Sequence, residues 1–518
     1  MSTSPATLDP DAAAESKPDL GHDAHTQAAD QVTPLPGRVR RPINVAFLGA
    51  GSTFCPKICR DILTIQTADR GELRLVDIDA DRLALTTKVV EQVISDLGKQ
   101  GGWSVRSSTD RREMLPGADY AVCSVEVSGT DCVAWDNDIP LKYGVDQCIG
   151  DTIGPGGLFK GLRTVPVFLD ILRDMAELCP GAVMLNYTNP MNMLVLAAGR
   201  AVPQVPVVGL CHSVQGTSHL LARYADVPYD ELEWECAGIN HLAWFTKLQH
   251  RGQDLYEKVL YAKFREQLAA GLEEARQGKA VHDNADNKFA ELPDKPYEQD
   301  DLIRKDMCVQ FGAFITESSG HLSEYLPYYR KSDAGRALLR RGYHGGSRFY
   351  ASNWPTWRKN MDLERQKWVD GSEKFDLERS WEYGSWIIES MEKNAPLRIH
   401  GNVMNHDATP GRASAGEAGK LITNLPGDGC VEVACYVDGN GIQPTRYGAL
   451  PRQMAPVCAS NMAMFDLAAE AIIHRSKEAA VHALLHDPLC AAVLSPREIR
   501  AMTHEMFDAE AAFLPGFE

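Results

Sequence analysis

Cys211 and His241 carry the clearest chemistry in this sequence. The tetrapeptide "CHSV" (211–214) directly follows the apolar run "VPVVGL", and "GINHLAW" supplies the histidine further along the chain. A thiolate and an imidazole are both ligands for divalent metal ions. Two protein ligands leave positions for substrate oxygens or water, which suits a catalytic ion that polarises a substrate. The alternative is that Cys211 is a small buried hydrophobe and His241 a hydrogen-bonded group at a domain edge.

The stretch "GAGSTF" predicts a turn that binds the pyrophosphate of a dinucleotide. Gly49 and Gly51 allow close approach to backbone N–H groups at a helix N-terminus. Phe54 stands at the third glycine position, so the fingerprint is incomplete, and a plain α/β turn is the alternative. Asp77 ends the next strand in "LVDID", where a carboxylate would bind the ribose diol and select NAD over NADP. The predicted cofactor contacts are Gly49, Gly51, Ser52, Thr53, Phe54 and Asp77.

Two more polar segments follow predicted strands or precede a predicted helix. Asn189 lies in "NYTNP" (186–190), and Asp151 lies in the loop "GDTIGPGG" (150–157). Ligands of open α/β sheets bind beyond the carboxyl ends of the strands. We therefore expect both residues to converge on Cys211 and the glycine turn. The alternative for Asn189 is an ordinary Asn-Pro turn.

The segments that position these residues alternate between strands and helices from residue 42 to residue 215. Strands without polar alternation are predicted at "INVAFLGAG", "ELRLVDID", "DYAVCSVEV", "AVMLNYTNP" and "VPVVGLC", with amphipathic helices between them. This pattern predicts an α/β domain with a doubly wound parallel sheet, covered on both faces and joined by right-handed crossovers. We interpret it as the cofactor-binding domain.

Residues 216–518 predict a second, α+β domain. "CAGINHLAWFTKLQ" reads as one strand, and residues 255–300 read as a helix followed by a polar insertion. Two helical segments are predicted near the C-terminus. Residues 1–41 hold almost no large apolar side chain, so we expect a disordered extension that ends in a solvated "RVRR".

The bulk composition excludes several classes of protein. The chain has 518 residues and a net charge of −17, which disfavours nucleic acid and anionic membranes as partners. We expect no membrane span and no secretory signal. Thirteen cysteines at scattered spacings, without a CxxC pair, indicate reduced thiols in a cytoplasm rather than a disulfide framework.

Six segments together resemble a known family. They are "FLGAGSTF", "GDTIGPGGLFKGLRTVP", "NYTNPMNML", "VGLCHSVQGT", "AGINHLAWF" and "TESSGHLSEYLPY", in one order along one chain. From about residue 43 to the C-terminus, the chain resembles the NAD- and metal-dependent glycosidases of glycoside hydrolase family 4, most closely the α-galactosidase branch. The resemblance implies a Rossmann-like domain followed by an α+β domain of the lactate dehydrogenase/glycosidase family 4 type, which carries substrate binding and oligomerisation.

The resemblance also implies a mechanism, redox-assisted elimination, which departs from the two-carboxylate rule of most glycosidases. NAD⁺ removes hydride from C3 of the sugar, a base removes the acidified C2 proton, and the glycosidic oxygen leaves from C1. Water then adds, and NADH returns the hydride. The implied cofactors are NAD and Mn²⁺, with Cys211 and His241 as metal ligands.

The remaining roles follow from matching motifs. Asn189 matches a residue that contacts sugar hydroxyls. Asp151 resembles the general acid, whose pKa we expect burial to raise towards neutrality. His212 is the competing acid, and both Asp151 and His212 are also expected to contact the substrate. The base is Asp306 in "KDMCVQFG" or Tyr297 in "KPYEQDD". Glu317, Ser318 and His321 in "TESSGH" either line the pocket, bridge subunits or serve packing.

The favoured hypothesis is an α-galactosidase acting on a small α-glycoside, as a cytoplasmic homodimer or homotetramer. A close variant would act on an α-galacturonide, α-glucuronide or α-glucoside. A second class is a net NAD-dependent 2-hydroxy acid dehydrogenase, which needs no Cys–His pair and accumulates NADH. A third class is a binding module without catalysis.

Overall fold

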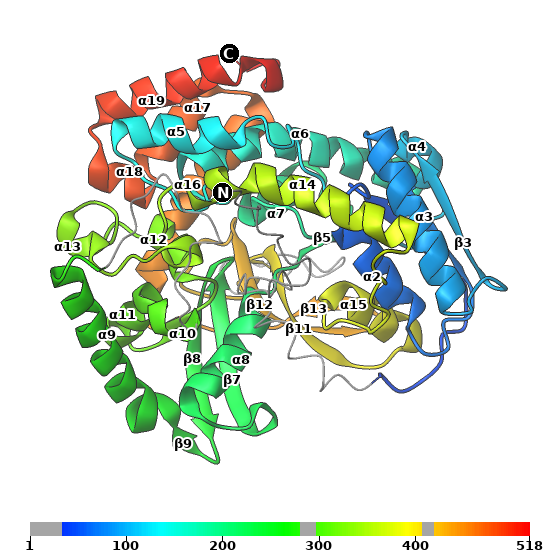
Figure 1. The fold of residues 1–518 in the computed structure, drawn as a ribbon, viewed down its shortest axis with the longest axis horizontal. Helices are drawn as coiled ribbons and strands as arrows, with labels where there is room; N and C mark the ends of the chain where they lie inside the picture. Colours follow the sequence, from blue (N-terminus) through cyan, green and yellow to red (C-terminus); the bar gives the residue numbers. More distant parts are fainter. Residues whose placement is uncertain (1–33, 280–296, 407–418, 518) are drawn as a thin grey trace, which may run out of the picture.

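The computed structural model describes residues 34–279, 297–406 and 419–517. One mixed sheet runs through the whole molecule in the order β10-β8-β7-β12-β11-β6-β5-β4-β1-β2-β3, with β13 paired to β12 and β9 to β8. Helices cover both faces of this sheet (Figure 1). The chain therefore builds its two predicted parts on one continuous hydrogen-bonded frame.

The parallel half has the strand order 3-2-1-4-5-6 of a dinucleotide-binding domain. All of its neighbouring strands pair in parallel. Its strands are β1 (Ile43–Leu48), β2 (Gly71–Val76), β3 (Trp103–Ser108), β4 (Tyr120–Cys123), β5 (Val183–Asn186) and β6 (Val207–Gly209). The strand order reverses between β1 and β4, which is where such sheets open a crevice for ligands. The predicted doubly wound sheet is confirmed.

The helices of this half begin at the carboxyl ends of the strands. They are α2 (Phe54–Leu63), α3 (Ala80–Asp96), α4 (Arg111–Met114), α5 (Val133–Tyr143), α6 (Gly154–Leu178), α7 (Met191–Ala201) and α8 (Ser213–Ala225). The predicted domain boundary between residues 215 and 216 falls inside α8 (Ser213–Ala225). The two predicted domains are also joined through the sheet, because β6 pairs with β11 (Leu397–Met404) of the C-terminal half.

The other half of the sheet is antiparallel. It comprises β7 (Leu232–Ile239), β8 (Leu242–His250), β9 (Gln253–Asp254), β10 (Phe314–Ile315), β11 (Leu397–Met404), β12 (Cys430–Asp438) and β13 (Gly441–Pro444). A single row of residues joins the halves: Gly209 pairs with Asn402, Asn402 with Glu432, and Glu432 with Gly238.

The segment "CAGINHLAWFTKLQ" is a hairpin rather than the one strand expected. Ile239 pairs with Leu242, so Asn240 and His241 form the turn between β7 and β8. His241 has a φ of 62°, a left-handed conformation that few residues other than glycine adopt. Its apolar neighbours hide this turn, because both strands are buried and read as one continuous hydrophobic run.

Helices of the C-terminal half surround the antiparallel strands and return to the first half. They are α9 (Tyr261–Arg276), α10 (Tyr297–Asp300), α11 (Leu302–Phe311), α12 (Ser319–Tyr325), α13 (Asp333–Arg336), α14 (Phe349–Asp370), α15 (Tyr383–Lys393), α16 (Ala455–His474), α17 (Lys477–Leu485), α18 (Pro488–Val493) and α19 (Pro496–Ala509). The first predicted C-terminal helix is two helices, since Arg475 takes a φ of 51° and Ser476 caps α17.

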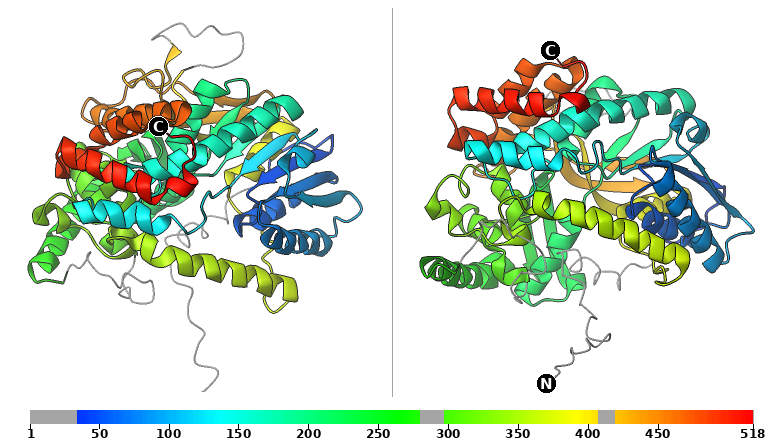
Figure 2. Two further views of the ribbon diagram at one scale, coloured as in Figure 1. Left: turned by 90° about the horizontal axis from the view of Figure 1, so that it is seen from above. Right: turned by 45° about the horizontal axis from the view of Figure 1, so that its top comes forward.

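The returning helices lock the two halves together. Helix α14 packs on α3 and α5, α15 packs on α2, and α16, α17 and α19 pack against α5, α6 and α7. Figure 2 shows these last helices stacked on the parallel half. Helix α16 is long and apolar enough to cross a membrane, contrary to our expectation that no segment would be, but half of its apolar window is buried against these neighbours. It is a core helix.

The start of the described chain is ordered, although disorder was expected up to residue 41. Leu35 donates its N–H to Glu389 and accepts from Lys393, both on α15. Arg41 pairs with Asp119 and Glu392. The last arginine of "RVRR" thus meets two acidic partners that the local sequence does not reveal. Residues 1–33 lie outside the described residues.

Candidate active site

The predicted site residues gather where the parallel strands end. Cys211 follows β6, Asn189 follows β5, and Asp151 precedes α6. The Asn189–Pro190 peptide bond is cis. The turn between β7 and β8 brings His241 to the same edge of the sheet, since its ring nitrogen lies beside the Cys211 thiol. Cys211 and His241 are therefore side by side, as the ligand-pair hypothesis requires.

Three side chains form a cluster with metal-binding geometry. Cys211 Sγ lies 3.4 Å from His241 Nε2, and His241 Nε2 lies 3.7 Å from Glu317 Oε2. All three ligand atoms are within 4.8 Å of one another. A thiolate, an imidazole and a carboxylate are three protein ligands, which leaves a coordination position open as in catalytic rather than structural sites.

The protonation of the cluster also fits a cation. Burial lowers the pKa of His241 to about 4, so the imidazole is neutral and keeps a lone pair at physiological pH. Burial, with help from Glu317 and Glu432, raises the pKa of the Cys211 thiol. A bound divalent ion reverses that effect, because metal ligation deprotonates a coordinating thiol. Glu317 has a φ of 74°, so two of the three ligand residues hold left-handed backbone.

Helix α12 ties this cluster to Asp151. His321 lies on α12 with Nδ1 3.1 Å from Glu317 Oε1 and Nε2 3.3 Å from Asp151 Oδ1. Ser318 caps the helix by accepting from the His321 N–H. Burial opposes a charged imidazole, but Asp151 and Glu317 raise the pKa of His321 to about 10. The "TESSGH" motif is therefore part of the site.

Asp151 is an anion in this arrangement, contrary to the expected general acid with a raised pKa. Burial would raise the pKa of Asp151, but Lys160 and His321 hold it well below its usual range. Lys160 Nζ lies 3.6 Å from Asp151 Oδ2, and Thr152 donates its hydroxyl at 2.6 Å. The sequence could not show that two cations would meet this carboxylate.

The loop before Asp151 is held from α12 as well. The fully buried Glu324 accepts backbone N–H groups of Cys148 and Ile149 at 2.6 Å and of Gly150 at 3.2 Å. Three donors on one carboxylate fix a loop that glycines would otherwise leave free. Helix α12 therefore holds Asp151 in two ways. His321 contacts its carboxylate, and Glu324 binds the loop that precedes it.

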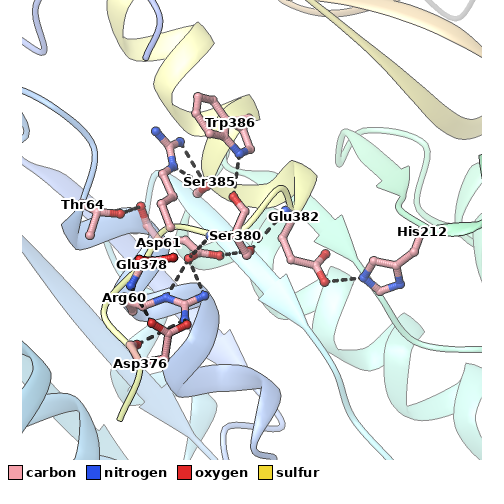
Figure 3. A network of polar contacts seen from close by, with 11 residues as sticks. Arg60, Asp61, Thr64, His212, Asp376, Glu378, Ser380, Glu382, Ser385 and Trp386 are labelled. Carbon is pink, nitrogen blue, oxygen red and sulfur yellow. Dashed lines mark hydrogen bonds and ion pairs between the residues drawn. The ribbon is translucent and has the colours of Figure 1, made fainter. Parts of the chain in front are cut away.

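His212 follows Cys211 in sequence, and its ring faces Glu382 (Figure 3). Its Nε2 is bonded to Glu382, and Trp381 contacts the ring edge-on at 5.6 Å. Burial lowers the pKa of His212, but Glu382 outweighs burial and raises it. A chain of hydrogen bonds continues from Glu382 to Ser380 and on to Asp61 of α2.

The glycine turn is built as a dinucleotide cradle. Gly49 has a φ of 86°, and a Cβ there would lie 2.6 Å from Ser124 O. The Gly51 N–H donates to Asp77 Oδ2 at 2.6 Å. Phe54 replaces the third glycine and packs edge-on against Tyr187 at 4.7 Å. Thr53 is the N-cap of α2, and Ser52 lies 3.4 Å from the Ser124 hydroxyl. These residues fit a pyrophosphate at the N-terminus of α2 and a ribose beside Asp77.

Family models match both halves of the chain. Residues 44–227 match the model described as family 4 glycosyl hydrolase, and residues 236–490 match its C-terminal domain. The chain belongs to family 4 of the glycosyl hydrolases.

Curated members of the family give the range of substrates. This glycosyl hydrolase is 33% identical to an alpha-galactosidase of Bacillus subtilis, over 92% of this chain and 99% of that protein. It is 26% identical to an alpha-galacturonidase of Thermoanaerobacterium saccharolyticum, over 92% of this chain and 97% of that protein. A 6-phospho-alpha-glucosidase from gut microorganisms, solved in complex with NAD and Mn²⁺, superimposes with a TM-score of 0.70 at 21% identity, over 92% of this chain and all of that one.

Of the two residues predicted as the base, the structure describes the side chain of Asp306 and not that of Tyr297. Asp306 on α11 accepts from the Tyr329 hydroxyl at 2.7 Å and from Gln310 at 3.2 Å. Among the described residues, no contact links Asp306 to Asp151 or to the candidate metal ligands. The Tyr297 side chain lies outside the described residues, although its backbone begins α10.

The sequence predicts the pairing of Cys211 with His241 that the structure shows. It leaves Glu317 and His321 open between pocket and packing, and it does not single out Lys160, Glu324 or Glu382. The three missed residues come from different elements, and each acts through a contact distant in sequence. Only "TESSGHLSEYLPY" carried a usable signal, because Glu317, His321 and Glu324 all face the site from one short segment.

Proposed function

We propose that this protein is an α-galactosidase that hydrolyses terminal α-galactosides with the help of NAD and Mn²⁺. The single observation that carries the proposal is the cluster of Cys211, His241 and Glu317 at the crevice of a dinucleotide-binding sheet. The identity to an alpha-galactosidase over nearly all of both chains supports the sugar.

Two groups from solution would complete the site. The turn at Gly49–Phe54 and Asp77 would hold NAD, and the three-residue cluster would hold Mn²⁺. When bound, they supply a hydride acceptor and a Lewis acid, respectively.

The chain's own residues supply position and charge. Asn189 is proposed to contact sugar hydroxyls from the loop after β5. Because Asp151 is held as an anion, proton donation falls to the other candidate, His212, which Glu382 orients. Asp306 and Tyr297 remain the proposed bases.

The charges around the cluster favour a neutral sugar over an α-galacturonide or a phosphorylated sugar. Lys160 pairs with Glu126 and Asp151. His321 pairs with Asp151 and Glu317, and His212 pairs with Glu382. These three cationic groups already meet carboxylates of the protein, so an anionic substituent would have to displace one of them. An α-glucoside differs from an α-galactoside only in the configuration of the 4-hydroxyl, and it stays as the second candidate.

The setting of the reaction is part of the same proposal. All thirteen cysteines are free, which supports a reducing cytoplasm. We propose a homodimer or homotetramer, with no nucleic acid or membrane partner.

The test is a panel of nitrophenyl glycosides, with NAD⁺, Mn²⁺ and reductant omitted in turn. We expect cleavage of the α-galactoside above the α-glucoside, α-glucuronide and α-galacturonide, with each omission lowering the rate. NADH should not accumulate during turnover. Stoichiometric NADH release with a 2-hydroxy acid would instead identify a net dehydrogenase, and absence of any turnover would leave a binding module.

A further inference from the structure

Lys160 is a buried cation beside Asp151, and the catalytic roles proposed above do not include it. It lies on α6, and its side chain is 14% exposed. Its ammonium nitrogen is 3.0 Å from Glu126 Oε2 and 3.6 Å from Asp151 Oδ2. A buried lysine is costly unless it is paired, and this one is shared by two carboxylates.

The position of Lys160 relative to Asp151 is fixed by close backbone packing. A Cβ on Gly156, in the first turn of α6, would overlap the carbonyl oxygen of Gly150 in the Asp151 loop. One turn further on, a Cβ on Gly161 would lie 2.6 Å from Met193 Sδ of α7. The first turn of α6 thus packs directly on the backbone of the Asp151 loop, and this packing holds the backbone of Lys160 near that loop.

The pKa values of the two carboxylates on Lys160 shift in opposite directions. Burial raises the pKa of Glu126, with Lys160 opposing the rise. Asp151 has a second cation in His321 and a hydroxyl donor in Thr152, and its pKa falls below its usual range despite burial. A carboxylate with such a low pKa is a poor acid and a poor base near neutral pH, because efficient proton transfer needs a pKa near the working pH. It is a strong hydrogen-bond acceptor.

We propose that Lys160 is a positioning residue that keeps Asp151 a fixed anion, and that Asp151 binds a hydroxyl group of the neutral sugar rather than transferring a proton. The proposal rests on the proposed function for the identity of the sugar. It gives Asp151 a role in affinity and in rejection of anionic substituents.

The groups that face Asp151 come from several elements. They are Lys160 from α6, Thr152 next to Asp151 in sequence, Glu126 after β4, His241 from the β7–β8 turn, His321 and Tyr325 from α12, and Tyr343 and Tyr350 around the start of α14. The two cationic groups in this set are Lys160 and His321. His321 contacts the candidate metal ligand Glu317, so Lys160 is the one whose charge can be removed without disturbing a candidate ligand.

The variants are Lys160→Met, Lys160→Arg and Asp151→Asn, with the exposed Lys142→Met as the matched control. In the presence of NAD⁺ and Mn²⁺, we expect Lys160→Met to raise KM for the α-galactoside about 10- to 100-fold, the worth of one charge-assisted hydrogen bond. The kcat should stay within about threefold, and Lys160→Arg should restore KM to within about threefold. The KM of the wild type should be flat between pH 6 and 9, whereas that of Lys160→Met should rise as the pH falls.

Two outcomes overturn the proposal. One is a loss of kcat with unchanged KM in Lys160→Met. The other is a change, in Lys160→Met, of an apparent pKa in the pH dependence of kcat. That change would mean that Asp151 transfers a proton during turnover.

Thermal unfolding separates this proposal from the proposed function. We expect the Tm changes of Lys160→Met and Asp151→Asn to be non-additive in the double variant, whatever the substrate is. Additive changes would disprove the coupling. A wild type that cleaves no glycoside and yet shows the coupling would refute the proposed function and the sugar contact while retaining the Lys160–Asp151 pair.

Discussion

At the scale of single residues, the site depends on a few groups whose surroundings reverse their usual behaviour. A buried thiol beside two carboxylates resists ionisation, and a cation is what makes it a ligand. A buried imidazole stays neutral in the same cluster. Cys211 and His241 could be predicted from sequence because each stands alone after an apolar run. Glu317 could not be assigned, because its role depends on a contact made by the fold.

Replacing Cys211 by serine tests the cation site. A serine hydroxyl is a poor ligand at neutral pH, so we expect Mn²⁺ affinity to fall at least about 100-fold and cleavage to be lost. NAD⁺ affinity should stay within about twofold, since the glycine turn is untouched. Electron paramagnetic resonance measures the ion and calorimetry the dinucleotide. Cys179→Ser, a buried cysteine at the end of α6, is the control, and equal loss in both variants would refute the assignment.

Gly49→Ala tests the dinucleotide cradle. The added Cβ would meet Ser124 O at 2.6 Å, and the φ of 86° disfavours any side chain. We expect NAD⁺ affinity to drop at least about tenfold. Gly98→Ala shares a positive φ of 65° but has nothing within 4 Å of its Cβ, so it should cost only about 1 kcal/mol and leave NAD⁺ binding unchanged. Equal NAD⁺ affinities in the two variants would contradict the assignment.

At the scale of elements, short segments do most of the positioning. Helix α12 presents His321 and Glu324 to the Asp151 loop, and its flank presents Glu317 to the cluster. The strands and helices of the parallel half could be predicted, because buried parallel strands and amphipathic helices have clear patterns. The β7–β8 turn and α12 could not, because their form is set by long-range packing and not by local propensity.

Asp487, the N-cap of α18, predicts a pH-dependent stability. It accepts the Cys490 N–H at 2.7 Å, and burial raises its pKa from 3.8 to about 6. A raised carboxyl pKa gives stability that is complete below about pH 4 and is lost as the pH rises through 6, in total roughly 2–3 kcal/mol. Asp487→Asn keeps the cap and removes the titration. We expect its Tm to exceed that of the wild type by a few degrees at pH 7.5 and to match it near pH 4.

The control for that measurement is Asp110→Asn. Asp110 is also an N-cap, of α4, and accepts the Arg112 N–H at 2.8 Å, but it is exposed. Because the burial argument does not apply to this carboxylate, Asp110→Asn should show no comparable gain in Tm at pH 7.5. A pH-independent difference for Asp487→Asn would contradict the burial argument.

At the scale of the whole molecule, the two halves form one unit. The row Gly209, Asn402, Glu432 and Gly238 continues the sheet across the expected domain boundary, and α14, α15 and α16 return to cover the first half. Sequence patterns cannot reveal that the halves form one unit. The strand pairing and the packing of α14, α15 and α16 on the first half are long-range contacts, and they leave no local pattern near residue 215.

A fragment of residues 34–227 should therefore not fold alone. It would expose the β6 edge and the faces that α15 and α16 cover, and exposed apolar surface of that extent favours aggregation. We expect the full chain to melt in one calorimetric transition and the fragment to lack cooperative unfolding by circular dichroism. A fragment that folds and binds NAD⁺ would show two independent domains.

The most direct test of the account is the location of the cation. Crystals of the full chain soaked in Mn²⁺ and NAD⁺ should show one anomalous peak at the manganese edge, about 2–2.5 Å from Cys211 Sγ, His241 Nε2 and a Glu317 oxygen. No peak at this cluster in crystals that cleave α-galactoside would contradict the account.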